Sequence, residues 1–84
     1  MIQDQPPPNT ARVLLDAEIE VRRGQTVPVL AQPATQRVIV LNSNVLNQTE
    51  LGQTIILHLP GQPAASVVVE AIDRSSLILR YSVG

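Results

Sequence analysis

Hydrophobic and charged side chains alternate along residues 11–22. Aliphatic positions from Val13 to Val21 share one face, and charged positions from Arg12 to Arg22 share the other. Because successive side chains of a β-strand point to opposite faces, this period of two predicts a half-buried strand. The length of the segment predicts either one bent strand or two short ones.

A second pattern is a sequence motif that occurs twice. Gly-Gln-Thr opens an aliphatic segment at Gly24 and again at Gly52, and each segment is followed by Gln-Pro-Ala and then by three consecutive aliphatic residues. Each copy predicts a glycine turn, a strand, a turn that contains proline, and another strand. The two similar units could pair with each other or lie side by side in the fold.

The same reasoning predicts further short strands. They are expected at residues 26–31, 37–41, 54–59, 66–72 and 77–83. The strand at 37–41 is aliphatic enough to be buried on both faces. In the last strand, Leu77, Leu79, Tyr81 and Val83 are expected to point inward.

Residues 42–51 form the one segment without a strand pattern. Its polar start is typical of turns and caps, and Val45, Leu46 and Leu51 could pack a helical turn or a loop into the mouth of a barrel. Five or six short strands without a convincing helix predict an all-β fold. We expect a small β-clip or barrel-like domain that contains two pseudo-repeated strand–turn–strand units.

The chain is predicted to hold one domain, since its 84 residues lie near the lower end of what folds unaided. Residues 1–10 contain Pro6, Pro7 and Pro8 and are expected to form a flexible or polyproline tether. Residues 11–84 are expected to form the single all-β domain.

The apolar residues are almost all aliphatic. There is no Phe or Trp, and Tyr81 is the single aromatic residue. Aromatic side chains usually dominate burial in cores and interfaces, so this core is expected to stabilise the fold less per residue. Oligomerisation or docking to a partner protein would therefore help.

Composition also limits the function classes. The chain has no Cys, which excludes disulfides, thiolate nucleophiles and cysteine-ligated metals. Its net charge is −1 with both signs interspersed, and it has one aromatic residue, so no nucleic-acid partner is expected. There is no run of about 18 apolar residues, which predicts no membrane span, and no signal peptide is visible after Met1.

Two sets of residues match catalytic groups in type alone. His58 is the only histidine, and a metal site or a catalytic base would need further groups in a set geometry. Asp73, Ser75 and Ser76 include an acid and a nucleophile, but hairpin loops use the same residue types. We expect a rim or surface histidine and a turn at 73–76, with no catalytic, cofactor or metal site. Clustering of His58 with Asp73 and either serine would instead indicate an enzyme.

Asp16, Glu18 and Glu20 share one face of the first strand, about 7 Å apart in steps of two residues. They could bind a cation or a basic partner. Because Arg12 and Arg22 flank them, cross-strand neutralisation on a solvated face is the simpler prediction.

Three outward aliphatic residues are the candidate protein-binding positions. Ile56, Val68 and Ile78 each alternate with positions that are expected to point inward. Together with exposed strand edges, they would bind a partner by strand addition or by hydrophobic docking. The same residues could equally be core residues of a second face.

Several segments, taken in order, carry a family resemblance. They are 21–27 (Val-Arg-Arg-Gly-Gln-Thr-Val), 29–31 (Val-Leu-Ala), 38–40 (Val-Ile-Val), 46–47 (Leu-Asn), 50–55 (Glu-Leu-Gly-Gln-Thr-Ile) and 67–71 (Val-Val-Val-Glu-Ala). This series resembles the C-terminal β-clip part of flagellar P-ring assembly chaperones of the FlgA type. A Pro-rich tether stands in place of that family's N-terminal half, so a related β-clip module fits better than a complete chaperone.

The resemblance implies a non-enzymatic protein of the bacterial cell envelope or periplasm, which binds another protein while a surface appendage is assembled. Pilus-assembly proteins contain related β-clip segments. The periplasmic adaptors of efflux and type I secretion systems share a similar barrel strand and are a second, weaker match.

Two functions from different classes follow. The first is a non-enzymatic protein-binding or assembly module of a bacterial cell-envelope or surface-appendage system, whether flagellar, pilus or secretion. The second is a self-assembling small structural β-subunit, such as a virion, tail or cassette-encoded protein. A monomer that captures a partner would favour the first function, and a concentration-dependent closed oligomer would favour the second.

Overall fold

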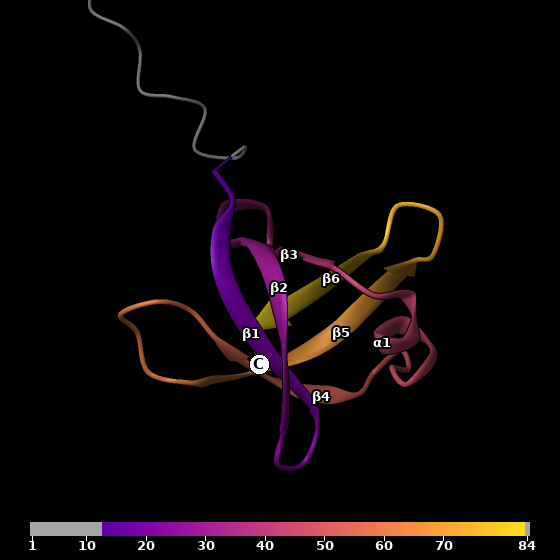
Figure 1. Ribbon diagram of the computed structural model, residues 1–84, viewed down its shortest axis with the longest axis horizontal. Helices are drawn as coiled ribbons and strands as arrows, with labels where there is room; N and C mark the ends of the chain where they lie inside the picture. The colour runs from indigo at the N-terminus through magenta and orange to yellow at the C-terminus, as the bar shows by residue number, and fades with distance from the viewer. Residues whose placement is uncertain (1–12, 84) are drawn as a thin grey trace, which may run out of the picture.

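Strands form where the sequence alternates between aliphatic and polar residues. The computed structural model describes residues 13–83, in which six antiparallel strands close into a small barrel (Figure 1). The strands are β1 (Leu15–Arg22), β2 (Gln25–Gln32), β3 (Arg37–Val40), β4 (Thr54–His58), β5 (Ala65–Asp73) and β6 (Ile78–Val83). The predicted all-β barrel is confirmed, while the tether predicted at residues 1–10 lies outside the described residues.

The strand order around the barrel is β1-β2-β3-β6-β5-β4, and β4 returns to pair with β1. The chain therefore makes two three-stranded meanders, β1–β2–β3 and β4–β5–β6, which meet along two seams. The β1–β4 seam pairs residues 18–20 with residues 56–58, and the β3–β6 seam pairs residues 37–39 with residues 78–80. Closure in this way removes the long exposed edges that an open sheet would have.

The repeated sequence motif corresponds to two hairpins. The first copy forms β2 and β3, joined through the 3₁₀ turn η2 (Pro33–Thr35), and the second copy forms β4 and β5. The hairpins do not pair with each other, because β6 lies between β3 and β5 while β1 lies between β2 and β4. Gly24 and Gly52 have φ values of 80° and 82°, which a residue with a side chain rarely adopts. The two glycines therefore supply the same kind of turn before each hairpin.

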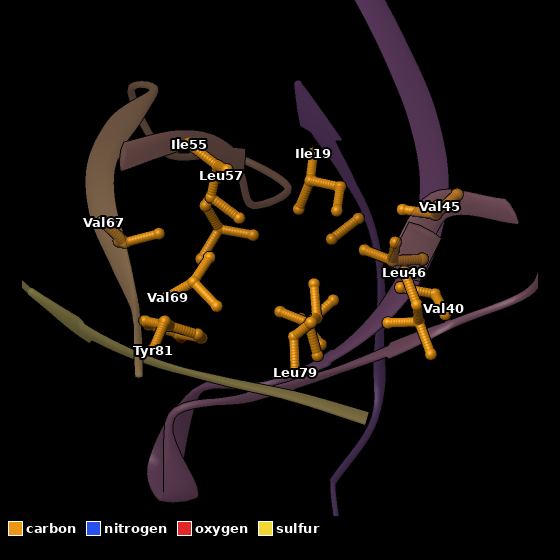
Figure 2. Packing of buried hydrophobic residues seen from close by; sticks show 14 residues of the cluster. Ile19, Val40, Val45, Leu46, Ile55, Leu57, Val67, Val69, Leu79 and Tyr81 are labelled. Atoms are coloured by element: carbon orange, nitrogen blue, oxygen red, sulfur yellow. The ribbon is translucent and has the colours of Figure 1, made fainter. Parts of the chain in front are cut away.

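Aliphatic side chains fill the barrel interior. The buried core consists of Ala17, Ile19, Val29, Ala31, Val38, Val40, Val45, Leu46, Ile55, Leu57, Val67, Val69, Leu79 and Tyr81. Figure 2 shows Ile19 of β1, Leu57 of β4 and Leu79 of β6 pointing into the same space. Burial raises the pKa of the Tyr81 phenol above its ordinary value, because the charged form loses its water.

One helical turn, α1 (Ser43–Asn47), lies between β3 and β4. The Asn42 side chain caps it by accepting a backbone N–H of the turn at 2.8 Å. Leu46 is almost completely buried and packs into the core (Figure 2). The buried hydroxyl of Thr49 donates to the Val45 carbonyl at 2.7 Å, which satisfies the one polar side chain buried among the described residues. The predicted helical turn packed by Val45 and Leu46 is confirmed.

Three expectations about inward positions are wrong. β3 is buried on one face only, with Val38 and Val40 inside and Ile39 half-buried outside, because a strand in a barrel wall can bury only alternate residues. Val83 is 67% exposed at the end of β6, beyond the residues that pair with β3. Leu51 is 66% exposed in the loop before β4 and does not pack inside the barrel.

Candidate protein-binding surface

An aliphatic strip crosses the outside of β2, β3 and β6. Leu30 lies opposite Ile39, and Ile39 lies opposite Ile78, so the three side chains stand in one row across neighbouring strands. All three are half-buried on the face away from the core. Directly opposed side chains of an antiparallel sheet are about 5 Å apart, so the three form one continuous surface, which we call the outer row.

A groove of about 480 Å³ adjoins the outer row, and Leu30 belongs to both. Leu41, the residue after β3, lines the groove and is 59% exposed. The lining residues come from β1, β2 and the ends of β3 and β4, namely Asp16, Ala17, Glu18, Pro28, Val29, Leu30, Leu41, His58, Leu59 and Pro60. In Figure 1 the loop after β4 stands out to the left of β1 and β2. A largely apolar groove beside an aliphatic strip is typical of a surface that binds another protein.

Charged side chains of opposite sign border the outer row. On the β1 side, Asp16 lies opposite Leu30, Glu18 lines the groove, and both carboxylates are exposed. On the β3–β6 side, Arg37 and Arg80 lie opposite each other and are also exposed. Along the row itself both ends are acidic, since Asp16 lies opposite Leu30 and Asp73 lies opposite Ile78, whereas the arginines lie beside the row, two residues along β3 and β6.

Two non-glycine residues with positive φ hold the ends of the β3–β6 seam. Gln36 has a φ of 55° and Leu77 a φ of 60°. The Gln36 carbonyl accepts a hydrogen bond from the Tyr81 amide at 3.0 Å, and the Leu77 carbonyl accepts one from the Val40 amide at 2.8 Å. Left-handed backbone costs a residue with a side chain about 1 kcal/mol or more. The seam is thus closed at both ends by strained residues.

The three candidate binding residues all lie on the outer face, but not together. Ile56, Val68 and Ile78 are each half-buried. Ile78 belongs to the outer row. Ile56 lies opposite Glu20 and Ser66, and Val68 is its diagonal neighbour on β5. Ile56 and Val68 therefore form a smaller patch that is separate from the outer row.

Leu30 and Ile39 belong to the candidate binding surface, and the sequence patterns miss both. The aliphatic run at 38–40 predicts burial on both faces, which hides Ile39 among core residues. Arg37 is the residue that could have indicated the orientation of Ile39. It stands two positions before Ile39, so both side chains are on the same face of the strand, and a charged residue is expected on the outer face. The contact between Leu30 and Ile39 follows from the register of β2 on β3, which no sequence pattern states.

His58 meets acidic side chains that are distant in sequence. It lies opposite Glu18 in the β1–β4 seam, and its Nε2 atom is 3.8 Å from Oε1 of Glu20. Nε2 is buried without a hydrogen-bond partner, although the side chain as a whole is 37% exposed. The ring thus lies at the rim of the groove. Within residues 13–83 no group of three His, Cys, Asp or Glu side chains is arranged to hold a metal ion.

Arg22 forms no ion pair with the acidic face of β1. Glu20 accepts a hydrogen bond from the Gly24 amide at 2.8 Å. Its contact with His58 is the one at ion-pair distance in the described part of the chain, and it is an ion pair only when the imidazole is protonated. Arg22 takes no part in it, and Arg12 lies outside the described residues. The residues opposite this face on β2 and β4 are Leu, Pro, Thr, His and Ile, so His58 is its one basic cross-strand neighbour among the described residues. Asp16 and Glu18 are exposed, as predicted for a solvated face, and neutralisation by Arg12 stays a prediction.

Residues 73–76 form a turn, as predicted. Oδ1 of Asp73 accepts hydrogen bonds from the Ser75 hydroxyl at 2.7 Å, the Ser75 amide at 3.1 Å and the Ser76 amide at 3.2 Å. These bonds, the Ser75 hydroxyl first among them, hold the pKa of Asp73 below its ordinary value. His58 lies beside the opposite end of β5, about 25 Å away along the strand. The cluster that would indicate an enzyme is therefore not formed.

No family model matches the chain, and no curated protein or solved structure does either. Among residues 13–83, no helix is long and apolar enough to span a membrane. The basis for a function is therefore the outer row, the groove and the charges that border them.

Proposed function

We propose that this protein is a non-enzymatic protein-binding or assembly module whose partner docks on the outer row. The alignment of Leu30, Ile39 and Ile78 across three strands is the observation that supports this. Single exposed aliphatic residues are ordinary, but a continuous strip beside an apolar groove is typical of a docking surface. A partner that covers the strip gains about 25 cal/mol for each Å² of apolar surface removed from water.

Side-chain docking fits the closed barrel better than strand addition. Strand addition needs a long edge of unpaired N–H and C=O groups, whereas here each strand pairs with a neighbour on both sides. The partner is therefore a protein segment that presents aliphatic side chains to Leu30, Ile39 and Ile78. It lies over the sheet and does not extend it.

The setting that we propose is a bacterial cell-envelope or surface-appendage system, flagellar, pilus or secretion, with the protein in the periplasm. Its support is the resemblance of residues 21–27 and 50–55 to P-ring assembly chaperones. In the fold these segments carry the turns at Gly24 and Gly52, from which β2 and β4 start.

Site-specific photo-cross-linking tests the proposal. A photoreactive residue at Ile39 or Ile78 is expected to capture one protein in cells, whereas the same residue at Val68, on the separate patch, is not. The captured protein is then identified, purified and titrated against the wild type and against Ile78→Asp. A charge buried against aliphatic side chains is expected to weaken binding at least about tenfold.

Results of two kinds would overturn the proposal. One is equal capture from Ile39 and Val68, or unchanged affinity in a folded Ile78→Asp variant. The other is loss of the folded state, seen by circular dichroism, in both Ile39→Asp and Ile78→Asp. That outcome would make the outer row part of the stabilising structure and would remove its docking role.

A self-assembling structural subunit is the second candidate function. The separate patch of Ile56 and Val68 supports it, because two apolar patches on one subunit allow a head-to-tail contact between copies. Light scattering over a wide range of protein concentration distinguishes the two functions. A stable oligomer that Val68→Asp dissociates would replace the first proposal, and a monomer at all concentrations would exclude the second.

A further inference from the structure

Two arginines face each other on the outside of the β3–β6 seam. Arg37 lies directly opposite Arg80, both side chains are exposed, and neither takes part in an ion pair with another described residue. Like charges placed directly opposite each other destabilise an antiparallel pair. Folding gains nothing from this arrangement, whereas a bound negative charge would relieve it.

The surroundings of the pair are apolar except for one carboxylate. A groove of about 320 Å³ is lined by Arg37, Ala71, Ile72, Asp73, Ile78 and Arg80. Asp73 lies opposite Ile78 and is turned to its own hairpin, where Oδ1 accepts hydrogen bonds from Ser75 and Ser76. Its carboxylate is not within ion-pair distance of either arginine.

The other neighbours leave the positive charge unbalanced as well. Gln32, which lies opposite Arg37 on β2, is uncharged. Glu70 is exposed at the register shift of β5 and lines a different groove together with Arg74. The described part of the domain therefore presents two guanidinium groups beside aliphatic side chains, with no carboxylate of its own between them.

We propose that Arg37 and Arg80 bind an acidic side chain of the partner segment that docks on the outer row, an inference that rests on the proposed function. Ile39 and Ile78 stand two residues along the same strands and share the outer face with the arginines. An extended segment with Asp or Glu two positions from an aliphatic residue matches this spacing, because its alternate side chains share a face. Guanidinium groups bind carboxylates through paired hydrogen bonds, and Arg is enriched among the residues that dominate interface affinity.

The register that brings the arginines together is held by strained backbone. Gln36 immediately precedes Arg37, Leu77 immediately precedes Ile78, and both have positive φ. A shift of one residue would turn the outer row inward and separate the arginines. Strain of this kind persists where the surrounding structure fixes a geometry, which is consistent with a site that needs charge and aliphatic positions at a set spacing.

Amide NMR titration with defined peptides tests the inference. The first probe is acetyl-Thr-Glu-Thr-Val-Thr-Ile-Thr-amide, and the second has Gln in place of Glu. The acidic peptide is expected to shift the amide signals of Arg37, Ile39, Ile78 and Arg80, and to bind about tenfold more tightly than the Gln peptide. Arg80→Gln should abolish this preference. Arg23→Gln, which removes an exposed arginine from the β1–β2 turn, should leave it unchanged.

The outcomes separate this inference from the docking proposal. If both peptides bind the outer row with equal affinity, the inference of an acidic side chain in the partner is overturned, and the proposal that a partner docks on the outer row is unaffected. If neither peptide shifts the amide signals of the outer row, the cross-linking result decides what is lost. When Ile78 still cross-links to a partner, only the acidic-partner inference is overturned. When it does not, the docking proposal is overturned as well. Inorganic phosphate is the third probe. If it shifts Arg37 and Arg80 as strongly as the acidic peptide at equal concentration, the pair is a simple anion site and the inference is overturned.

Urea unfolding gives an independent readout without any ligand. Arg80→Gln is expected to shift the unfolding midpoint to higher urea concentration, because it removes the repulsion from Arg37. A shift of the midpoint to lower urea concentration would mean that Arg80 stabilises the fold, and it would overturn the inference.

Discussion

The β1–β4 and β3–β6 seams close the barrel in the same way, each through three pairs of residues. In both seams the middle pair is aliphatic and buried. Ile19 lies opposite Leu57 in the β1–β4 seam, and Val38 lies opposite Leu79 in the β3–β6 seam. The two inner faces therefore contribute to the same core and are expected to matter equally for stability.

Their outer faces differ in charge. In the β1–β4 seam, Glu18 lies opposite His58, and Glu20 lies against the same ring. In the β3–β6 seam, arginine faces arginine and isoleucine faces isoleucine. Complementary cross-strand neighbours stabilise a sheet, while like charges oppose it. The outside of the first seam thus brings an acidic side chain against a histidine, whereas the outside of the second keeps like charges together, where we propose that a partner binds.

The largest expected effects test whether the inner faces are equivalent. Leu57→Ala and Leu79→Ala remove the same side chain from the middle of each seam, where both residues are buried. Each is expected to lower the free energy of unfolding by about 3 kcal/mol, through lost transfer free energy and the cavity left behind. Urea unfolding measures both variants. A difference of more than about 2 kcal/mol between them would contradict the equivalence.

Backbone changes next to each seam are expected to have opposite signs. Gly24→Ala, after β1, should lower the free energy of unfolding by about 1 kcal/mol through its φ of 80°, since a Cβ there would meet no neighbouring atom. Gln36→Gly, before β3, should raise it by about 0.5 kcal/mol, because relief of strain exceeds the entropy cost of glycine. Thermal unfolding of both variants checks the signs, and a destabilised Gln36→Gly would remove the case for strain at the β3–β6 seam.

Outer charges should shift stability in opposite directions at the two seams. Arg80→Gln is expected to raise the free energy of unfolding by about 0.5 kcal/mol. His58→Gln is expected to lower it by no more than about 0.5 kcal/mol, because it removes the contact with Glu20. High salt should shrink both differences, because both positions are partly exposed. Two changes of the same sign would mean that the outer faces do not differ as described.

The smallest effect concerns the hairpin that leads into the β3–β6 seam. The pKa of Asp73 is lowered in the folded state, so its carboxylate stabilises the fold above the ordinary value of 3.8. That contribution should disappear as the pH falls through the lower, folded pKa. The wild type is therefore expected to be more stable than Asp73→Asn near neutral pH, with the gap closing as the pH falls below the ordinary value of 3.8. Urea unfolding from pH 6 to pH 2 measures the difference in free energy of unfolding between the two proteins. A difference that grows in acid would contradict the hydrogen bonds assigned to Asp73.

Local structure in this chain could be predicted from the sequence because strand periodicity and turn chemistry are local properties. The alternation at residues 13–21 predicts β1, and the glycines at 24 and 52 predict the turns before β2 and β4. The turn at Asp73 follows from its residue types in the same way. Each of these features depends on neighbours within a few positions.

The candidate binding surface could not be predicted in the same way, because it depends on which strands become neighbours. Alternation places Ile78 on an outer face, but only the β3–β6 register sets Ile39 beside it. The same holds for the meeting of Arg37 with Arg80 and for that of His58 with the acidic face of β1. The charge contrast between the seams is thus a property of topology, and no window of sequence contains it.

Closure through two seams also sets the route by which the chain must fold. Each seam joins residues from opposite halves of the sequence, so one meander alone would expose its aliphatic inner face to water. Folds that depend on such distant pairings form slowly, typically within milliseconds to seconds. During synthesis β1, β2 and β3 are made first, and β1 and β3 have no second neighbour until β4 and β6 follow. The half-made chain is therefore the stage at which this protein is most open to misassembly.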